Sequence, residues 1–166
     1  MLAIATPARA QFGDLSSTTA ALSVSIPVGD LETLAQTGYG IVLRQGMGEP
    51  NSKWFGRGSF GFDYFKGNGV TDNVQYIVTG LDLVHRTSSA FYQYGGLGLN
   101  NTRITTKSSS GVFNNRSEQN FQLSAGAGVN FGEETGTRWF LEFSAVTVFS
   151  GRGNLSSFPI RIGMKF

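Results

Sequence analysis

The last ten residues of the chain decide the fold, and they read Ser157-Phe158-Pro159-Ile160-Arg161-Ile162-Gly163-Met164-Lys165-Phe166. Successive side chains of an extended chain point to opposite faces. One face of this stretch is therefore polar or small, whereas the other is apolar throughout and ends on an aromatic residue. The apolar face consists of Phe158, Ile160, Ile162, Met164 and Phe166. The pattern predicts a terminal β-strand with one side in an apolar environment.

The same alternation of apolar and polar residues recurs along the chain from Thr19 onward. It is clearest over residues 121–131, where Phe121, Leu123 and Val129 alternate with Gln122 and Ser124. The pattern predicts eight strands of about ten residues, near 20–26, 38–44, 54–65, 74–85, 90–99, 121–131, 138–145 and 157–166. Transmembrane strands need ~9–11 residues, which is more than the ~5–6 of an average strand. Eight is also the smallest strand count of bacterial membrane barrels.

The composition is typical of a β-barrel in a membrane. Charged residues make up 14% of the chain, below the roughly 25% of soluble domains, while aromatic residues reach 13% and glycines number 23. No apolar run approaches the ~20 residues of a membrane-spanning helix. The net charge is +2, and no basic run suits a nucleic acid. The chain has no cysteine and one histidine, which excludes disulfides, thiolate metal sites and a histidine-based metal centre.

The length predicts one domain, preceded by a short processing segment. Residues 1–10 are interpreted as the remnant of a signal peptide, because Ala8-Arg9-Ala10 fits the small-x-small cleavage pattern. The barrel domain would then span residues 11–166. The basic start and the apolar centre of a signal peptide are missing, so a plain N-terminal tail is the alternative.

The predicted connections and aromatic residues indicate an orientation in the membrane. A long polar stretch, residues 100–119, follows the fifth strand, whereas a four-residue turn, 86–89, follows the fourth. Outer-membrane barrels have long loops outside and short turns in the periplasm, so both termini are expected in the periplasm. Aromatic residues should form a belt at each membrane interface. The expected periplasmic belt is Trp54, Tyr92, Phe131, Trp139 and Phe166, and the expected outer belt is Tyr39, Tyr64, Tyr76, Phe121, Phe149 and Phe158.

The fifth strand shows one irregularity. Tyr92 and Tyr94 share one face, whereas Leu97 and Leu99 share the other, so the apolar side chains change face within the strand. The Gly95-Gly96 pair between them predicts a β-bulge.

The repeated strand pattern and the ending Met164-Lys165-Phe166 resemble the small outer-membrane β-barrels of the OmpA/OmpX type. The resemblance covers residues 11–166 and rests on pattern rather than on a diagnostic motif. It implies an all-β, eight-stranded antiparallel up-and-down transmembrane β-barrel in the bacterial outer membrane. It also implies that the barrel-assembly machinery reads the apolar face from Phe158 to Phe166 as an insertion signal. A soluble lipocalin-like barrel for a small ligand, with the apolar face inside, is the alternative.

The inward-facing positions are predicted to carry charges of both signs. Eight strands enclose only enough room for side chains, and isolated charges there are costly, so ion pairs are expected. A narrow proton or ion path is the alternative to such a packed, non-porin interior. The predicted lumen charges are Arg44, Arg57, Asp63, Asp82, Glu142 and Arg161, with Arg86 and Lys165 as further candidates.

No catalytic residue and no cofactor is predicted. Some small barrels are lipid A-modifying enzymes, and the resemblance keeps that activity as an alternative function. Those enzymes use a histidine with a serine near the outer leaflet. Here His85, with Ser88 and Ser89 beside it, falls at the expected periplasmic end.

Function is instead expected in the outer stretch of residues 100–119, because a rigid barrel presents its loops to partners. Its interaction candidates are Arg103, Lys107 and Arg116. Cations at the outer rim can pair with the phosphates of lipopolysaccharide. The expected partners are therefore outer-membrane lipids and lipopolysaccharide, with host or envelope ligands at the outer loops as a further possibility.

Overall fold

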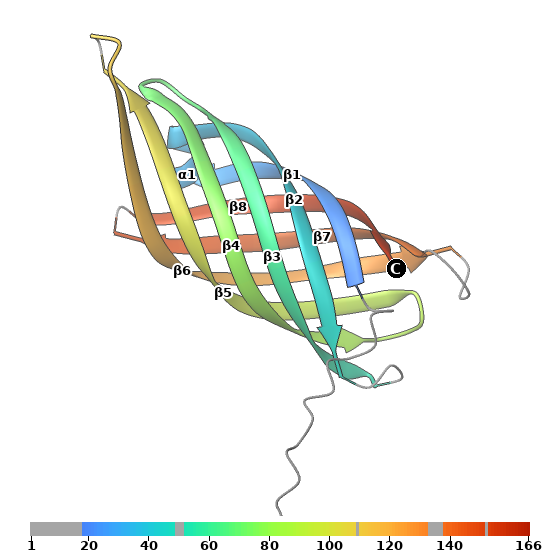
Figure 1. Cartoon of the computed structure of the whole chain (residues 1–166). Coiled ribbons are helices and arrows are strands. Elements are labelled where there is room, and N and C mark those ends of the chain that lie inside the picture. The colour runs from blue at the N-terminus through green and yellow to red at the C-terminus, as the bar shows by residue number, and fades with distance from the viewer. Residues whose placement is uncertain (1–17, 49–51, 109, 133–137, 152) are drawn as a thin grey trace, which may run out of the picture.

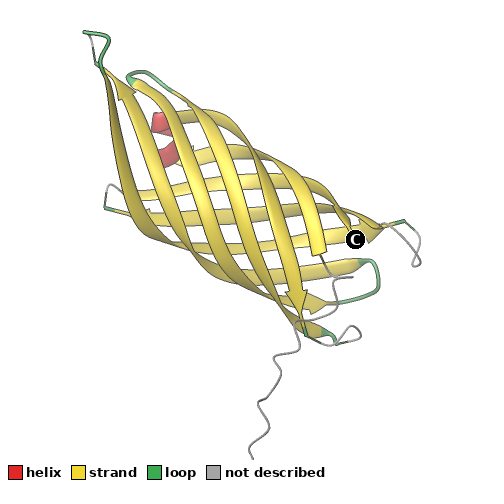
Figure 2. Ribbon diagram, viewed as in Figure 1, coloured by secondary structure: helices red, strands yellow, loops and turns green. Residues whose placement is uncertain are grey.

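A computed structural model describes residues 18–48, 52–108, 110–132, 138–151 and 153–166, whose strands close into a single barrel (Figures 1 and 2). Each strand pairs antiparallel with its neighbours in sequence, and the last pairs with the first. This confirms the predicted eight-stranded up-and-down barrel. Among the described residues, no helix has the length and apolarity to cross a membrane. The elements are β1 (Thr18–Gly29), α1 (Asp30–Leu34), β2 (Ala35–Met47), β3 (Trp54–Gly67), β4 (Thr71–Arg86), β5 (Phe91–Lys107), β6 (Phe113–Phe131), β7 (Arg138–Ser150) and β8 (Gly153–Lys165). Residues 1–10, the expected signal-peptide remnant, lie outside the described residues.

Strand β8 closes the barrel against β1, and the alternation seen in the sequence determines which face points outward. Ile160 lies opposite Val24, and Ile162 lies opposite Leu22. All four side chains are exposed on the outside of the barrel, whereas Pro159 and Gly163 are buried within it. The terminal apolar face therefore belongs to the outer surface.

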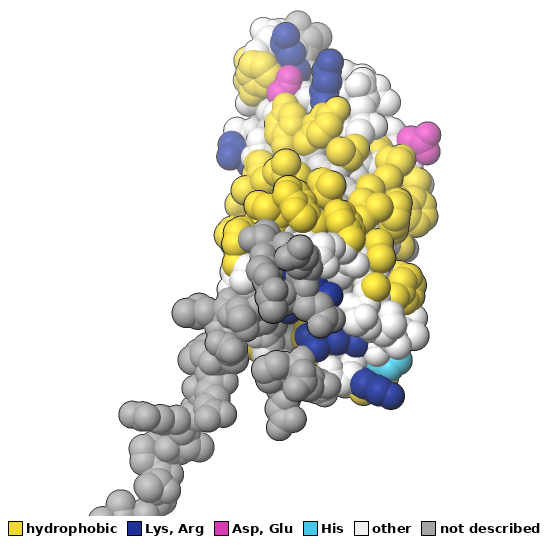
Figure 3. Space-filling view, turned by 90° about the vertical axis from the view of Figure 1, so that its right-hand side faces the viewer, with side chains coloured by type: hydrophobic (Ala, Val, Ile, Leu, Met, Phe, Trp, Pro, Cys, Tyr) yellow, Lys and Arg dark blue, Asp and Glu magenta, His cyan; other side chains and the backbone are white. Residues whose placement is uncertain are grey.

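The outward surface carries a continuous apolar band around the barrel, visible as the yellow zone in Figure 3. Soluble monomers rarely expose contiguous apolar surface on this scale, so the band is the face that contacts lipid. The lipocalin-like alternative, which needed the apolar residues inside, is therefore wrong. Exposed members of the band include Leu22, Ile41, Leu43, Phe60, Phe62, Leu81, Leu83, Leu97, Leu99, Leu123, Phe143 and Ile162.

Most of the predicted belt aromatics lie on the outward surface, but Tyr76 and Tyr92 do not. Both side chains are buried inside the barrel, and Tyr94 is buried beside Tyr92. The ladder between β4 and β5 runs without a register shift past Gly95 and Gly96, so the predicted bulge is absent there. The tyrosines of β5 point inward and its leucines outward along a regular strand. The bulge prediction failed because it assumed that every aromatic residue faces lipid. Trp54, Phe131, Trp139 and Phe166 are exposed toward one end, and Tyr39, Tyr64, Phe121, Phe149 and Phe158 toward the other.

The predicted outer loop at residues 100–119 is wrong, because nearly all of it is strand. Strand β5 continues to Lys107 and β6 begins at Phe113, in one ladder that pairs Asn100 with Asn120 and Lys107 with Phe113. Only residues 108–112 connect the two strands. Outside the lipid, the outward face of a strand need not be apolar. The alternation of apolar and polar residues that marks the other strands is therefore missing from this polar segment. Figure 1 shows this hairpin reaching farther than its neighbours at the upper left.

We call this projecting part of the β5–β6 hairpin the tongue, and it comprises residues 101–107 of β5 and 113–120 of β6. Strand β6 pairs with β7 only from Phe121 inward, so residues 113–120 have an unpaired edge within the described part of the chain. The connections at this end span residues 68–70, 108–112 and 151–152, besides α1, whereas those at the other end span 48–53, 87–90 and 132–137. The predicted contrast of long outer loops and short periplasmic turns is therefore not found. The two ends differ instead in strand length, and we call the end with the extended β5–β6 hairpin the outer end.

Deleting Phe166, or replacing it with Asp, is expected to lower the amount of inserted protein several-fold. The backbone N–H of Phe166 donates to the carbonyl of Thr18 at 2.9 Å, so this residue completes the seam between β8 and β1. It also ends the apolar face that resembles the insertion signal. The measurement is the heat-modifiable gel shift of outer-membrane fractions. Phe113→Asp, an equally exposed aromatic in the tongue, is the control and should leave the amount unchanged. Equal levels for both variants would contradict this role.

Candidate functional site

The half of the lumen nearer the termini is organised around the buried carboxylate of Glu142. Arg44 binds it with two hydrogen bonds, of 2.6 Å from Nη2 to Oε1 and 3.0 Å from Nη1 to Oε2. Arg57 donates to Oε2 at 3.2 Å, and Arg161 donates to Oε1 at 3.0 Å. Three guanidinium groups from β2, β3 and β8 thus converge on one acid from β7. Bidentate, charge-assisted hydrogen bonds of this kind are among the strongest in proteins.

Two tyrosines complete the hydrogen bonding of this carboxylate. The hydroxyl groups of Tyr92 and Tyr94 donate to Oε2 at 3.1 Å and to Oε1 at 3.0 Å. The Arg57 guanidinium lies 4.4 Å from the centre of the Tyr94 ring, and its Nε donates to Asp82 at 2.9 Å. Glu142 therefore accepts six hydrogen bonds and Asp82 partly balances the surplus positive charge. We call Glu142, Asp82, the three arginines and the two tyrosines the charge cluster.

The structure brings five of the six predicted lumen charges into this cluster and leaves Asp63 apart. Asp63 accepts a hydrogen bond from the Ser23 hydroxyl at 3.0 Å. Among the described residues, no Lys or Arg nitrogen lies within 4 Å of it. The further candidates Arg86 and Lys165 lie half-buried at the mouth nearer the termini. The sequence analysis did not place the two tyrosines in the lumen. Both are an even number of residues from the polar Asn100 on the same strand, and this spacing already indicated that they face inward with it.

The outer half of the lumen contains a cluster of buried apolar side chains, to which α1 contributes. This single helical turn joins β1 to β2, and its Leu31 is completely buried. The sequence predicted strands near 20–26 and 38–44 and no helix between them, because a five-residue helix shows no period of its own. The layer, which we call the apolar plug, consists of Leu31, Ala35, Phe65, Val74, Tyr76, Ile104, Val146, Val148 and Leu155.

The predicted outer cations do not form a single site. Arg116 pairs with Glu118 and lies opposite Ile104 in the β5–β6 ladder. Ile104 belongs to the apolar plug, so its side chain points inward. Residues directly opposite each other in a ladder share a face, so Arg116 also lies on the inner face of the tongue. Arg103 and Lys107, at odd positions of β5, lie on the outer face and are exposed. The Lys107 ammonium lies 5.8 Å from the Phe113 ring. The outward cation pair is therefore Arg103 and Lys107.

The residues weighed for catalysis have structural partners. His85 stacks on Trp54 with ring centroids 4.3 Å apart, and its Nδ1 lies 3.5 Å from Gln93 Nε2. The Ser88 hydroxyl accepts the backbone N–H of Phe91 at 3.0 Å, which holds the β4–β5 turn. Across the described residues, no group of three His, Cys, Asp or Glu side chains could hold a metal ion. These contacts stabilise strand ends and a turn.

Solved structures with the same architecture are found among bacterial outer-membrane proteins. The attachment invasion locus protein Ail of Yersinia pestis is 19% identical, with a TM-score of 0.69 over 90% of this chain and 97% of that chain. Neisserial surface protein A (NspA) is 16% identical, with a TM-score of 0.61 over 90% and 96% of the two chains. The N-terminal β-barrel domain of Pseudomonas aeruginosa OprF is 14% identical, with a TM-score of 0.58 over 91% and 98%. No protein-family model matches the chain, and no curated protein sequence matches it.

Proposed function

Because the chain has the fold of small outer-membrane β-barrels, we propose that it is a surface-recognition protein of the outer membrane with a closed lumen, and neither a porin nor an enzyme. The observation that carries the proposal is the tongue, which presents charged side chains and a strand edge beyond a barrel whose interior is filled.

Two layers of side chains support the proposal of a closed lumen. The charge cluster bridges β2, β3, β4, β5, β7 and β8 across the barrel, and the apolar plug fills the outer half. A permeating ion would have to displace the arginines from Glu142 and then pass the apolar plug, in which Tyr76 bears the only polar side-chain group. Both steps are costly in an environment of low dielectric constant. A stable ohmic conductance of pore size in planar bilayers would contradict this part of the proposal.

The ligand class favoured by the tongue is an anionic glycan. Arg103 and Lys107 stand four residues apart on one strand face, so their side chains point the same way, about 13 Å apart along the strand. Repeating phosphate or sulfate groups match such a spacing. Ail has been solved in complex with the heparin analogue sucrose octasulfate. The phosphates of lipopolysaccharide and the sulfates of a host glycan share this chemistry, and both are candidate partners here.

The test is the binding of sucrose octasulfate to the refolded barrel, measured by calorimetry at low ionic strength. Replacing both Arg103 and Lys107 with Gln is expected to weaken binding at least tenfold, because each charge-assisted contact is worth about 1.5–3 kcal/mol. Arg116→Gln is the matched control, since its guanidinium is paired with Glu118 on the inner face. Equal binding by the double variant and the control would rule out the outward pair as the binding site.

The unpaired edge of β6 favours a second candidate, the capture of an extended polypeptide. Exposed edges present backbone N–H and C=O groups that can accept an added strand. Every second residue of 113–120 directs its backbone N–H and C=O toward this edge, while the others bond to β5. A bound polypeptide would protect their amides from hydrogen exchange, and unchanged exchange in the presence of a candidate partner would exclude this mode.

A further inference from the structure

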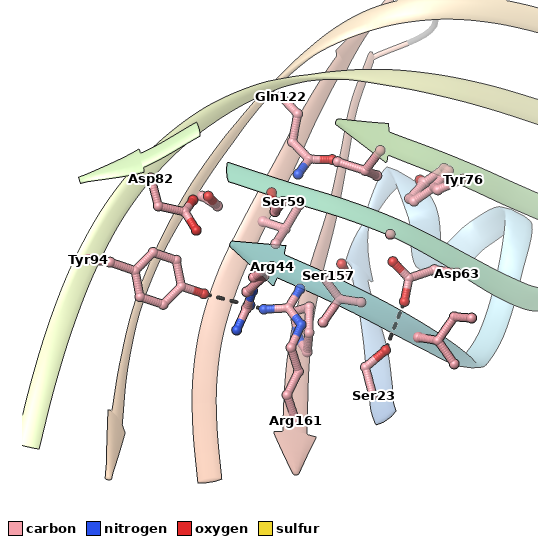
Figure 4. A pocket seen from close by; sticks show the side chains of 17 residues that line it. Ser23, Arg44, Ser59, Asp63, Tyr76, Asp82, Tyr94, Gln122, Ser157 and Arg161 are labelled. Carbon is pink, nitrogen blue, oxygen red and sulfur yellow. Dashed lines mark hydrogen bonds between the residues drawn. The ribbon is translucent and has the colours of Figure 1, made fainter. Parts of the chain in front are cut away.

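A small polar cavity lies inside the barrel between the charge cluster and the apolar plug (Figure 4). Its volume is about 50 Å3, and its lining includes Ser23, Asp63, Tyr76, Gln122, Ser157 and Arg161. A water molecule needs roughly 10–15 Å3 of free space and two to four polar partners. The cavity therefore has room for about three waters.

Two of the polar side chains that line this cavity have a buried atom without a hydrogen-bond partner among the described residues. The Tyr76 hydroxyl is buried and has no hydrogen-bond partner among the described residues, and neither does Nε of Arg44. Asp63, directly opposite Tyr76 in the β3–β4 ladder, accepts a hydrogen bond from Ser23, and among the described residues no Lys or Arg nitrogen lies within 4 Å of its carboxylate. Buried polar groups in native proteins are nearly always satisfied by protein or by ordered water. These atoms point to an occupant that can both donate and accept hydrogen bonds.

The strand register shows how the space is kept open. Along one row across the inner face, Arg161 lies opposite Ser23, Ser23 opposite Gly40, and Gly40 opposite Asp63. A Cβ at Gly40 would collide with the Asp63 carboxylate and with the Ser23 hydroxyl. Because glycine has no side chain, the Ser23 hydroxyl and the Asp63 carboxylate can form their hydrogen bond over this position. The glycine also leaves a gap between the carboxylate and the guanidinium of the same row.

The charge balance distinguishes water from an ion as the occupant. Inside the lumen, away from Arg86 and Lys165 at its mouth, the described residues include three arginines and three acids, whose net charge is zero when all six groups are ionised. A bound cation or anion would add an uncompensated charge in a site of low dielectric constant, which is costly. The balanced set is Arg44, Arg57, Arg161, Asp63, Asp82 and Glu142.

We propose that this cavity is a binding site for a cluster of ordered waters that joins the Asp63 carboxylate and the Tyr76 hydroxyl to the Arg161 guanidinium. Asp63 and Arg161 then form a water-separated ion pair, and the polar middle of the lumen is hydrated although both of its ends are closed. The proposal concerns the interior alone and does not depend on what the tongue binds.

A crystal structure of the refolded barrel at high resolution, grown in rubidium chloride, tests the nature of the occupant. The expected result is density for two to four waters, with at least one within hydrogen-bond distance of both Asp63 and Tyr76, and no anomalous signal. An anomalous rubidium peak beside Asp63 would show a cation site and overturn the proposal. An empty cavity would overturn it equally.

A pair of glycine variants gives an independent answer in solution. Gly61 lines the cavity and Gly58 faces outward on the same strand, and both have room for a Cβ at ordinary contact distances. Gly61→Ala is expected to displace water and therefore to unfold at a lower urea concentration than Gly58→Ala. If the cavity is dry, the added methyl group fills a void, and Gly61→Ala would unfold at the higher concentration instead. That order would overturn the proposal.

Discussion

Replacing Glu142 with Ala is expected to lower the free energy of unfolding by about 3–5 kcal/mol, the typical cost of breaking a buried ion pair from one side. The substitution removes the acceptor of six hydrogen bonds and leaves Arg44 and Arg161 without a carboxylate within 4 Å among the described residues. The measurement is urea-induced unfolding in lipid vesicles, followed by tryptophan fluorescence and by the gel shift of the folded barrel. Unfolding should occur at a clearly lower urea concentration, or refolding should fail.

Two further variants separate the charge from the side chain at this position. Glu142→Gln keeps the shape and part of the hydrogen bonding, so it should be destabilised less than the alanine variant. Glu118→Ala removes an acid from the tongue, where its pair with Arg116 is partly exposed, and it should cost at most about 1 kcal/mol. An alanine variant of Glu142 as stable as the wild type would show that the charge cluster does not hold the barrel together.

Placing Arg at Leu123 is expected to cost up to about 2–4 kcal/mol, because this position lies within the lipid-facing band, two residues inside Phe121. Leu123 is exposed on the outside of β6, between Phe121 near the outer interface and Phe131 near the other. A guanidinium there has no partner in the hydrocarbon. The measurement is the change in the urea midpoint on refolding into lipid vesicles.

The matched control for Leu123 is Gln119→Arg, on the same face of the same strand but beyond the apolar band. The cost of arginine falls to ~0–1 kcal/mol near the interface, so this variant should resemble the wild type. Leu141→Arg and Ile162→Arg should follow Leu123→Arg. Equal costs at Leu123 and Gln119 would mean that the outward surface is not in lipid.

The fold could be predicted from local alternation, because a barrel wall in lipid imposes a period of two on every strand that crosses it. Phe158, Ile160 and Ile162 show this directly, and their outward direction was correctly inferred. The six lumen charges were predicted for the same reason, because each lies at a position that alternates with the outward apolar residues of its strand. Where the wall leaves the lipid this constraint disappears, and the strand segments on either side of residues 108–112 were therefore taken for a loop.

The alternating sequence by itself thus determined the barrel, its strand number and, apart from the inward tyrosines, the division of residues between wall and lumen. Only the tertiary structure decided which inward residues meet. Glu142 contacts Arg44, Arg57 and Tyr94 across 98, 85 and 48 positions of the chain, and such contacts depend on barrel closure and strand stagger rather than on any local pattern. The direction of Tyr92 and Tyr94 was decided in the same way, because a tyrosine suits either a membrane interface or a buried acceptor for its hydroxyl. The acceptor exists only once β5 and β7 face each other across the closed lumen.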